Sequence, residues 1–530
     1  MATQQDQILE AMRHPEFYPH PVAAIERRET HISTVFLTGS YVYKVKKPVN
    51  LGFLDFSTLD QRRFYCQREI VLNRRLSRDV YLDVVPITLQ GAHYRISGPG
   101  TPLEYAVKMR QLADGDAMVQ RLKRSDVSDS DIDNLAHLLV SFYEGTAVVD
   151  LKGIDDDRAG SGPPWQENFK TLRPFAGRYL DRSRFVSVEN AAHAFFSHRQ
   201  RLFRRRVENG RIRDCHGDLR SDHIYFTPDG IQIIDCIEFN DHFRFQDIIS
   251  DLAFLAVDLE DHQFAQTADT IVERYIEQTN DLEALPLFDF YRCDRAMVRC
   301  KVSCVRIEQI ERDVRERDTL QAAADRYLAM AHAFATAFNR PTLWIVFGLP
   351  ASGKSTIARE LGKLWDMEVL RSDVIRKRLY QTNGDPSGPS EFGKGLYTRD
   401  ATVATYERML SMAGELLDRN ESVVLDATFS RAAWRAAAID LARENQTETI
   451  FVECDVSEAI LAARLRERET QPTISDARLT HLAHFRKGFE PFTPTGNQVH
   501  LVVDTGQPLP SSLRQIMTSR VLQSPEGGRL

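Results

Sequence analysis

The chain has 530 residues, of which 42% are hydrophobic and 27% are charged, and its formal net charge at pH 7 is −7. This length exceeds what one hydrophobic core usually supports, so we expect at least two domains, and the balance of residue types excludes wholesale disorder. The acidic charge balance excludes a broad basic surface for nucleic acid, and no apolar run reaches the ~18 residues of a membrane-spanning helix. The polar N-terminus and the seven cysteines, which form no CxxC pair, lead us to expect a cytoplasmic protein with reduced thiols and no membrane attachment.

The first predicted elements are a β-hairpin over 34–47 and a helix over 60–77. Lys44 ends the β-rich sequence YVYK, and Glu69 lies within the predicted helix. In kinases, a strand lysine that is fixed by a helix glutamate positions the α- and β-phosphates of a nucleotide. We favour Lys44 over its neighbour Lys46 for this role. The alternative is that the lysines of this segment protect an edge strand from aggregation.

Two aspartates near the middle of the chain form a second candidate pair. Asp218 follows the sequence CHG, and Asp235 ends the second strand of a predicted hairpin further along the chain. A loop followed by a hairpin can bring the two carboxylates together at one mouth. Phosphoryl transfer uses such a pair, with one carboxylate accepting the acceptor's proton and the other holding magnesium. We expect His216 to brace this loop rather than to do chemistry.

A change of pattern predicts where the first domain ends. The polar stretch over 150–165 predicts a loop, and the chain from Asp247 to about Phe338 is predicted to be mainly helical. The sequence Asn339-Arg340-Pro341 breaks this helical pattern, and an apolar strand follows it. The predicted organisation is an N-terminal domain over 1–338, a C-terminal domain over 341–515 and a flexible tail over 516–530.

The strongest local pattern is the sequence GLPASGKS at 348–355, a complete GxxxxGK[ST] motif between an apolar strand and a helix. Its glycines let backbone N–H groups turn toward phosphates, and the helix presents its positive end to them. We expect Lys354 to reach the β- and γ-phosphates and the hydroxyl of Ser355 to bind magnesium. The alternative is a glycine-rich turn with an incidental lysine. The predicted nucleotide-binding residues here are Gly348, Ser352, Gly353, Lys354, Ser355 and Thr356.

Three further features follow this motif. Asp373 and Arg376 form a DxxR pattern, in which the carboxylate can accept a proton from an acceptor hydroxyl and the arginine can hold an anionic acceptor. Asp426 ends the apolar strand VVLD, as in a Walker B segment that binds magnesium. Arg464 and Arg468 share one face of a predicted helix and could close over the transferring phosphate as a lid. The corresponding alternatives are a helix start, a helix cap and a solvated Arg/Glu face.

In this order, the four features resemble the P-loop small-molecule and polynucleotide kinases, which include gluconate kinase, the zeta toxins and the kinase domain of phage polynucleotide kinase. The resemblance covers about 341–510 and extends to Ser475-Asp476-Ala477. It implies an α/β domain with a parallel sheet. The roles that it implies are general base for Asp373, acceptor binding for Arg376, and a lid for Arg464 and Arg468.

Residues 25–330 resemble the aminoglycoside phosphotransferase branch of the protein-kinase-like fold, through the CHGD and IID sequences and through Asp251-Leu252-Ala253. This resemblance implies an α+β domain with Asp218 as the catalytic aspartate and Asp235 as a metal ligand. The sequence departs from the branch at His223, which replaces the asparagine that binds a second magnesium ion, so that His223 becomes a candidate metal ligand. It also lacks a full GxGxxG loop.

Together the two halves resemble a bifunctional family that joins an aminoglycoside phosphotransferase-like domain to a P-loop ATP-binding kinase domain. This resemblance implies an enzyme that uses ATP and Mg²⁺ to transfer the γ-phosphoryl group to a hydroxyl of a small molecule. Two alternatives stay open. The C-terminal half could be a 5′-hydroxyl polynucleotide kinase, although the charge balance does not support nucleic acid as a partner. The chain could instead be a nucleotide-dependent regulatory switch with a degenerate N-terminal domain, which would need no acceptor base such as Asp373.

Overall fold

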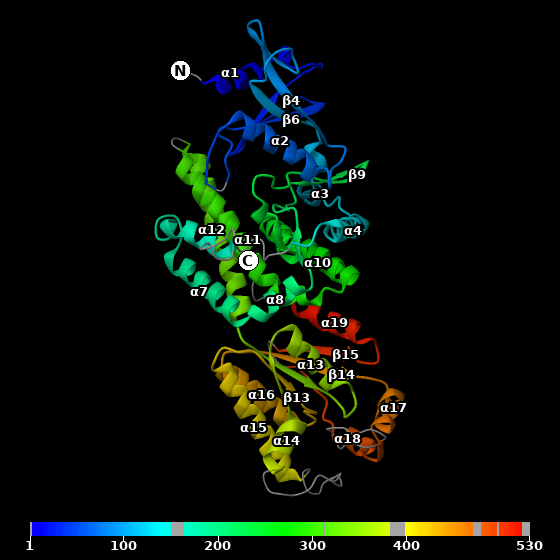
Figure 1. Cartoon of the computed structure of the whole chain (residues 1–530). Coiled ribbons are helices and arrows are strands. Elements are labelled where there is room, and N and C mark those ends of the chain that lie inside the picture. The colour runs from blue at the N-terminus through cyan, green and yellow to red at the C-terminus, as the bar shows by residue number, and fades with distance from the viewer. Residues whose placement is uncertain are drawn as a thin grey trace. The chain divides into compact units, whose positions relative to one another are not determined.

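The computed structural model (Figure 1) describes residues 3–52, 54–149, 164–310, 313–381, 398–469, 479–494 and 498–521. These described residues belong to two compact units, and each unit takes in segments that lie far apart in the sequence. The first unit consists of Met1–Phe185, Arg206–Gln278 and Tyr291–Ala331. The second unit consists of Val186–Arg205, Thr279–Phe290 and His332–Leu530. The second unit therefore includes two segments that precede the boundary predicted between residues 338 and 341.

In the described part of the first unit, six strands form an antiparallel sheet in the order β1-β2-β3-β6-β4-β5. The strands are β1 (Glu26–Glu29), β2 (Ser33–Leu37), β3 (Tyr41–Lys46), β4 (Tyr81–Gln90), β5 (His93–Ile96) and β6 (Glu104–Arg110). The predicted hairpin over 34–47 is confirmed, because β2 pairs with β3. Since β3 lies between β2 and β6, it is an interior strand, and its lysines do not protect an edge.

Helix α2 (Leu59–Asn73) covers one face of this sheet and packs against β4 and β6. It begins with a capping box, in which the side chain of Thr58 and the side chain of Gln61 each accept the other residue's backbone N–H. It ends before residue 77, where the sequence pattern predicted its end. Its inner face buries Ile70 and also Glu69, which is completely buried. A carboxylate is rarely buried in this way unless it is paired.

The rest of the N-terminal half is mainly helical, with two short pairs of strands. β8 (Ile224–Thr227) pairs with β9 (Gly230–Ile233), which confirms the predicted hairpin before Asp235, and β7 (Ile212–Asp214) pairs with β10 (Phe245–Asp247). The helices are α1 (Gln4–Ala11), α3 (Met118–Lys123), α4 (Asp129–Gly145), α6 (Pro164–Leu172), α7 (Arg182–His198), α8 (Gln200–Glu208), α9 (Ile248–Asp261), α10 (Ala265–Thr279), α11 (Leu285–Gln309) and α12 (Val314–Asn339). Helices α9 to α12 confirm the helical character predicted from Asp247 onward.

The described strands of the second unit form a five-stranded parallel sheet in the order β12-β13-β11-β14-β15. They are β11 (Thr342–Phe347), β12 (Glu368–Arg371), β13 (Val423–Asp426), β14 (Glu448–Asp455) and β15 (Val499–Asp504). Every residue of β11 is buried, as expected for the central strand of a parallel sheet. The sheet confirms the predicted α/β class of the C-terminal half.

Helices cover both faces of this parallel sheet. They are α13 (Lys354–Leu364), α14 (Ser372–Gln381), α15 (Arg399–Leu417), α16 (Ala432–Glu444), α17 (Glu458–Glu469), α18 (Leu482–Lys487) and α19 (Leu509–Val521). Ile345 of β11 packs in one core with Met409 of α15 and Ala438 of α16. Trp344 points to the opposite face, because side chains alternate along a strand, and it contacts Trp365 at the end of α13. Helices α13 and α19 pack against each other.

One predicted loop ends earlier in the structure, and the predicted helix breaker is found where expected. The loop predicted up to residue 165 ends earlier, because α6 begins at Pro164 and buries Trp165; residues 150–163 lie outside the described residues. The helix breaker is confirmed, since α12 ends at Asn339 and β11 begins at Thr342.

The predicted flexible tail also begins too early. Helix α19 continues to Val521, and its residues Ile516 and Met517 are fully buried, so this helix is part of the folded unit. Residues 522–530 lie outside the described part of the chain. Among the described helices, none has both the length and the apolar character needed to cross a bilayer.

Candidate active sites

The first candidate site lies where β3 and α2 meet the loop after β9. Lys44 projects from β3, and its Nζ lies 2.9 Å from Oε1 of Glu69 and 2.6 Å from Oδ1 of Asp235. Lys46 is fully buried; its Nζ lies 2.7 Å from Oε2 of Glu69 and also contacts Glu238. The structure therefore brings Lys44, rather than Lys46, to the predicted metal aspartate.

The charges of Lys44, Glu69 and Asp235 stabilise one another. Burial disfavours the charged form of Lys44, but the carboxylates of Asp235 and Glu69 outweigh this effect and hold the pKa of Lys44 well above its usual value. Burial also tends to raise the pKa of Asp235, yet Lys44 beside it holds that pKa well below its usual range. Both groups are therefore charged at neutral pH, and Asp235 presents an ionised oxygen ligand.

The backbone of Asp235 adopts an unusual conformation. Its φ is +64°, a left-handed value that costs a non-glycine residue roughly 1–2 kcal/mol. Hydrogen bonds hold it there: the N–H of Asp235 donates to the hydroxyl of Tyr81 at 3.1 Å, and the N–H of Cys236 donates to Oδ1 of Asn73 at 2.8 Å. Sequence reasoning missed Tyr81 and Asn73, because their role depends on contacts that only the fold creates.

A buried carboxylate binds the backbone of the loop that carries Asp218. Asp251 on α9 is completely buried, and its two oxygens accept the backbone N–H groups of His216 at 3.0 Å and Gly217 at 2.9 Å. The ring of His216 bonds to the carbonyl of Ile234 at 3.0 Å, so this histidine braces the loop as expected. Burial lowers the pKa of His216 and keeps its ring neutral.

His223 lies between the two predicted aspartates. Its Nδ1 lies 3.0 Å from the backbone carbonyl of Asp218, and its Nε2 lies 3.7 Å from Oδ2 of Asp235. In a neutral imidazole that donates from Nδ1 to a carbonyl, Nε2 carries a lone pair that can bind a metal ion. The structure thus places His223 near both Asp218 and Asp235, although no three His, Cys, Asp or Glu side chains of the described residues are grouped so that they could hold a metal ion. The turn between β1 and β2, where kinases carry a glycine-rich loop, contains no glycine and is closed by the side chain of Thr30.

The second candidate site is the loop between β11 and α13. Gly348 and Gly353 have φ values of +138° and +90°. A Cβ at Gly348 would lie 2.5 Å from the carbonyl oxygen of Cys454, so only glycine fits this part of the loop. Nζ of Lys354 donates to the carbonyl of Leu349 at 2.9 Å and therefore lies over the loop. This backbone cradle at a helix N-terminus fits the phosphates of a nucleotide.

Replacing Gly348 by alanine tests the cradle. We expect nucleotide affinity at this loop to fall at least about tenfold, or ~1.4 kcal/mol, because the added Cβ collides with backbone rather than with a flexible side chain. The measurement is titration of the full-length chain with a fluorescent ATP analogue and Mg²⁺. Gly91→Ala is the matched control, since Gly91 also has a positive φ but has open space around its Cβ position. Equal affinities for the two variants would contradict the cradle.

The carboxyl ends of three neighbouring strands bring the remaining residues to this loop. Asp426 ends β13 beside β11, and its Oδ2 accepts the Nε of Arg371 at 3.1 Å. Asp373 lies in the first turn of α14, directly after β12, and Nη1 of Arg376 lies 3.6 Å from its Oδ1. Because parallel strands end at one edge, Asp426 and Asp373 lie at the edge that carries the phosphate loop. Arg371 is a residue that sequence reasoning missed.

A buried tyrosine fixes the segment that joins this edge to the phosphate loop. The hydroxyl of Tyr406 on α15 accepts the N–H of Phe429 at 3.0 Å and lies 3.3 Å from the hydroxyl oxygen of Thr428. The carbonyl of Thr428 in turn accepts the N–H of Gly348 at 3.4 Å. Tyr406 stacks on Trp434 with ring centroids 4.7 Å apart. Sequence reasoning missed this brace as well.

The predicted lid arginines are described only in part. Arg464 lies on α17, as predicted, and donates to the carbonyls of Ala351 at 3.3 Å and Thr505 at 2.7 Å. It therefore contacts the backbone of the phosphate loop. The side chain of Arg468 and the segment Ser475-Asp476-Ala477 lie outside what the structure describes.

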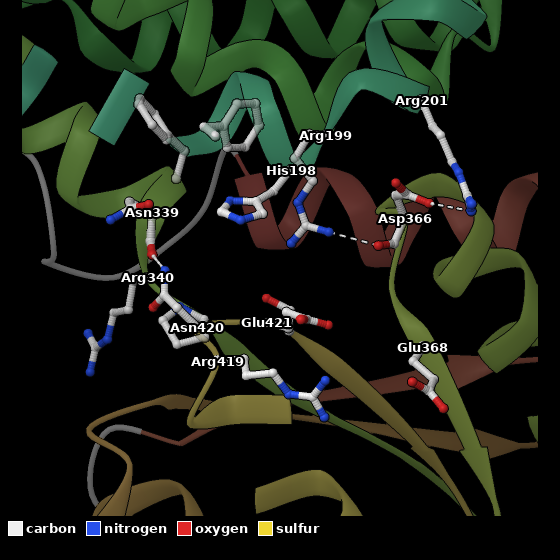
Figure 2. A pocket seen from close by; sticks show the side chains of 14 residues that line it. His198, Arg199, Arg201, Asn339, Arg340, Asp366, Glu368, Arg419, Asn420 and Glu421 are labelled. Carbon is white, nitrogen blue, oxygen red and sulfur yellow. Dashed lines mark hydrogen bonds and ion pairs between the residues drawn. The ribbon is translucent and has the colours of Figure 1, made fainter. Parts of the chain in front are cut away.

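A cavity of about 320 Å³ in the second unit lies away from this edge (Figure 2). Pro341, Glu368 and Ser422 line it at the amino ends of β11, β12 and β13. Parallel α/β sheets bind ligands at the carboxyl ends of their strands, so this cavity is not the nucleotide site. Figure 2 shows Arg199 and Arg201 reaching toward Asp366 at its rim.

This chain is similar to several known proteins. Residues 343–492 match the model of a family described as AAA domain. An uncharacterized protein of Mycobacterium tuberculosis (strain ATCC 25618 / H37Rv) is 33% identical over 463 residues, which cover 85% of this chain and 88% of that protein. A gluconokinase from Sinorhizobium meliloti is 20% identical and covers 35% of this chain and 94% of its own, with a TM-score of 0.25. A choline/ethanolamine kinase family protein from Mesorhizobium loti is 14% identical and covers 63% of this chain and 95% of its own, with a TM-score of 0.37.

Proposed function

The chain belongs to the same family as the mycobacterial protein, and we propose that it is an ATP- and Mg²⁺-dependent phosphotransferase with two phosphotransfer units. It transfers the γ-phosphoryl group of ATP to a hydroxyl of a small molecule. The observation that carries this proposal is the edge of the parallel sheet, where the phosphate loop, Asp426 and Asp373 meet. A nucleotide switch needs the first two of these features, but only a kinase needs the third.

In the P-loop unit, the backbone N–H groups of the loop and Lys354 bind the phosphates. Ser355 and Asp426 would hold magnesium, which would neutralise charge on the β- and γ-phosphates. Asp373 accepts the proton of the acceptor hydroxyl, and Arg376 beside it holds an anionic group of the acceptor. Arg464 supplies positive charge at the rim of the phosphate loop.

In the first unit, Lys44 positions the α- and β-phosphates and Glu69 orients it. Asp218 accepts the proton of a second acceptor hydroxyl. Asp235 and His223, whose Oδ2 and Nε2 lie 3.7 Å apart, would hold the metal ion there. Imidazole replaces an amide oxygen at position 223, so this unit has an unusual ligand set for magnesium.

The test of the proposed function is a transfer assay with γ-labelled ATP on the full-length chain. The acceptors are a panel of hydroxyl metabolites, with oligonucleotides that carry a free 5′-hydroxyl as a separate arm. Each assay is repeated with Lys354→Ala and with Asp218→Asn, which assigns any activity to one unit. Label on oligonucleotides alone would establish the polynucleotide kinase alternative. ATP hydrolysis without a labelled acceptor would establish the regulatory switch.

Replacing Asp373 by asparagine separates a kinase from a switch. Asparagine keeps the shape of the side chain but cannot accept the acceptor's proton, so we expect transfer to slow by ~10²–10⁴-fold. Nucleotide affinity should stay nearly unchanged, since Asp373 acts on the acceptor's proton and not on the phosphates. The matched control is Asp400→Asn, because Asp400 is also an aspartate in the first turn of a helix but is exposed on α15. Transfer within twofold of wild type would mean that Asp373 only caps α14.

A further inference from the structure

Helix α13 follows the phosphate loop at its N-terminal end. The carbonyl groups at its C-terminal end need hydrogen-bond donors from elsewhere. The last carbonyl groups of an α-helix have no N–H of the same helix to accept. Here the N–H of Trp365 donates to Leu361 and the N–H of Met367 donates to Gly362, with Asp366 in a left-handed conformation. The bond from Met367 to Gly362 closes the end of the helix as the longer bond of a Schellman motif does, and among the described residues no backbone N–H group donates to the carbonyls of residues 363–366.

Two arginines from a distant segment supply the missing donors. Arg205 on α8 donates to the carbonyls of Lys363 and Leu364. Arg199, just before α8, donates to the carbonyls of Trp365 at 3.2 Å and Asp366 at 2.7 Å. Figure 2 shows Arg199 extended toward Asp366. The four carbonyls in sequence are thus bound by two guanidinium groups, which we call the arginine clamp.

The clamp belongs entirely to the second unit. Val186–Arg205 and the helix α13 are both part of that unit, although more than a hundred residues separate them in the sequence. Positive charge at a helix C-terminus also complements the helix dipole. Burial lowers the pKa of Arg199, so placing this guanidinium here has a cost that its two hydrogen bonds offset. Arg201, in contrast, is 80% exposed and lies 3.6 Å from the carboxylate of Asp366.

Helix α13 packs closely against the sheet, so its position can change only slightly. A Cβ at Gly362 would lie 2.4 Å from Cγ2 of Val369 on β12, so the helix backbone lies directly on this strand. At the other end, Gly353 has no side chain to cap the first turn. The helix is short, so a small tilt at its C-terminal end changes where its first N–H groups point. Sites that bind by oriented groups tolerate a displacement of only ~0.5 Å.

We propose that Arg199 and Arg205 are positioning residues for nucleotide binding at the phosphate loop. They fix the axis of α13 from its C-terminal end, and thereby the direction of the N–H groups and of Lys354 at its N-terminal end. This inference rests on the proposed function only in taking the loop as the nucleotide site. It also means that residues 341–530 do not form the complete P-loop unit, because the clamp comes from residues 186–205.

The experiment measures nucleotide affinity at the phosphate loop in the full-length chain. A fluorescent ATP analogue with Mg²⁺ is titrated into Arg199→Ala, Arg205→Ala and the double variant. Each is made with and without Lys354→Ala, and the difference isolates binding at this loop from binding in the first unit. We expect the double variant to lose about fivefold or more in affinity, with smaller losses for the single variants. Arg205→Lys, which keeps the charge but not the paired donors, should lie between wild type and Arg205→Ala.

Arg204→Ala is the matched control. Arg204 is exposed on the same helix, and its side chain makes no hydrogen bond or ion pair to any described residue. Melting temperatures are recorded for all variants, and affinities are measured well below them. A lower melting temperature with affinity within twofold of wild type would overturn the proposal, since the clamp would then only stabilise the fold. Equal losses in Arg204→Ala and Arg205→Ala would also overturn it. If Lys354→Ala alone fails to reduce binding, the proposed nucleotide site is wrong, which is a separate result.

Discussion

Lys354→Ala in the full-length chain is expected to abolish transfer by the P-loop unit while the fold stays intact. The Nζ of Lys354 lies over the loop, bound to the carbonyl of Leu349, so its removal takes one positive charge from the phosphates. Loss of one such stabilising group in an active site costs at least ~10²–10³-fold in rate. The glycines of the loop set its backbone path, and Lys354 adds a hydrogen bond to the carbonyl of Leu349, so the melting temperature should change little.

The measurement is transfer from γ-labelled ATP in an Asp218→Asn background, so that only the P-loop unit contributes. Lys487→Ala is the control, since Lys487 is exposed on α18 of the same unit. Undiminished transfer by the Lys354→Ala variant would show that the phosphate loop is not part of the catalytic site. A loss of activity that parallels a fall in melting temperature would instead report damage to the fold.

The P-loop unit is the part of the chain that the sequence predicts best. Its motifs are short, and three of them follow a strand directly, the clearest being the fully buried sequence TLWIVF before Gly348. A parallel sheet then brings the ends of neighbouring strands together whatever the length of the connections. For this reason Asp373 and Asp426, which the sequence marks as separate features, lie at one edge of the sheet in the structure.

The first unit depends on contacts between residues that are distant in the sequence. Lys44 and Lys46 point to the same face of β3, so periodicity alone cannot separate them. Their difference comes from Asp235, which lies 191 residues further along the chain and pairs with Lys44, and from Glu238, which pairs with Lys46. Neither pairing follows from local sequence.

Among the residues whose contacts the sequence did not predict, some left a signal and others left none. Asp251 lies in the apolar sequence IISDLAFLAV, and an aspartate inside such a helix is expected to be buried and paired. Arg205, in contrast, lies in the arginine-rich sequence QRLFRRRVE, which is typical of a solvated surface. Only the structure shows that it binds the end of α13. These contacts join Val186–Arg205 to the second unit.

Asp235→Ala tests whether the first unit is a working kinase. Asp235 is the carboxylate that Lys44 holds in its charged form, and Tyr81 and Asn73 hold the backbone of this segment through hydrogen bonds. If it holds the metal ion, its loss should reduce transfer by this unit by ~10³-fold or more, and Mg²⁺ should no longer strengthen ATP binding there. The measurement uses the full-length chain with Lys354→Ala, so that only the first unit transfers phosphate, and compares ATP affinity with and without Mg²⁺.

His223→Asn is the companion variant for this prediction. Asparagine supplies an oxygen ligand in place of the imidazole that lies 3.7 Å from Asp235, and Mg²⁺ prefers oxygen ligands. Transfer by the first unit should therefore be preserved or increased, with Mg²⁺ required at a lower concentration.

A different result would show that the first unit has no kinase activity. If the Lys354→Ala chain binds ATP equally well with and without Mg²⁺ and labels no hydroxyl acceptor, the first unit is regulatory. The chemistry then belongs to the P-loop unit alone, and His223 marks the position where the kinase-like site lost its second metal ligand.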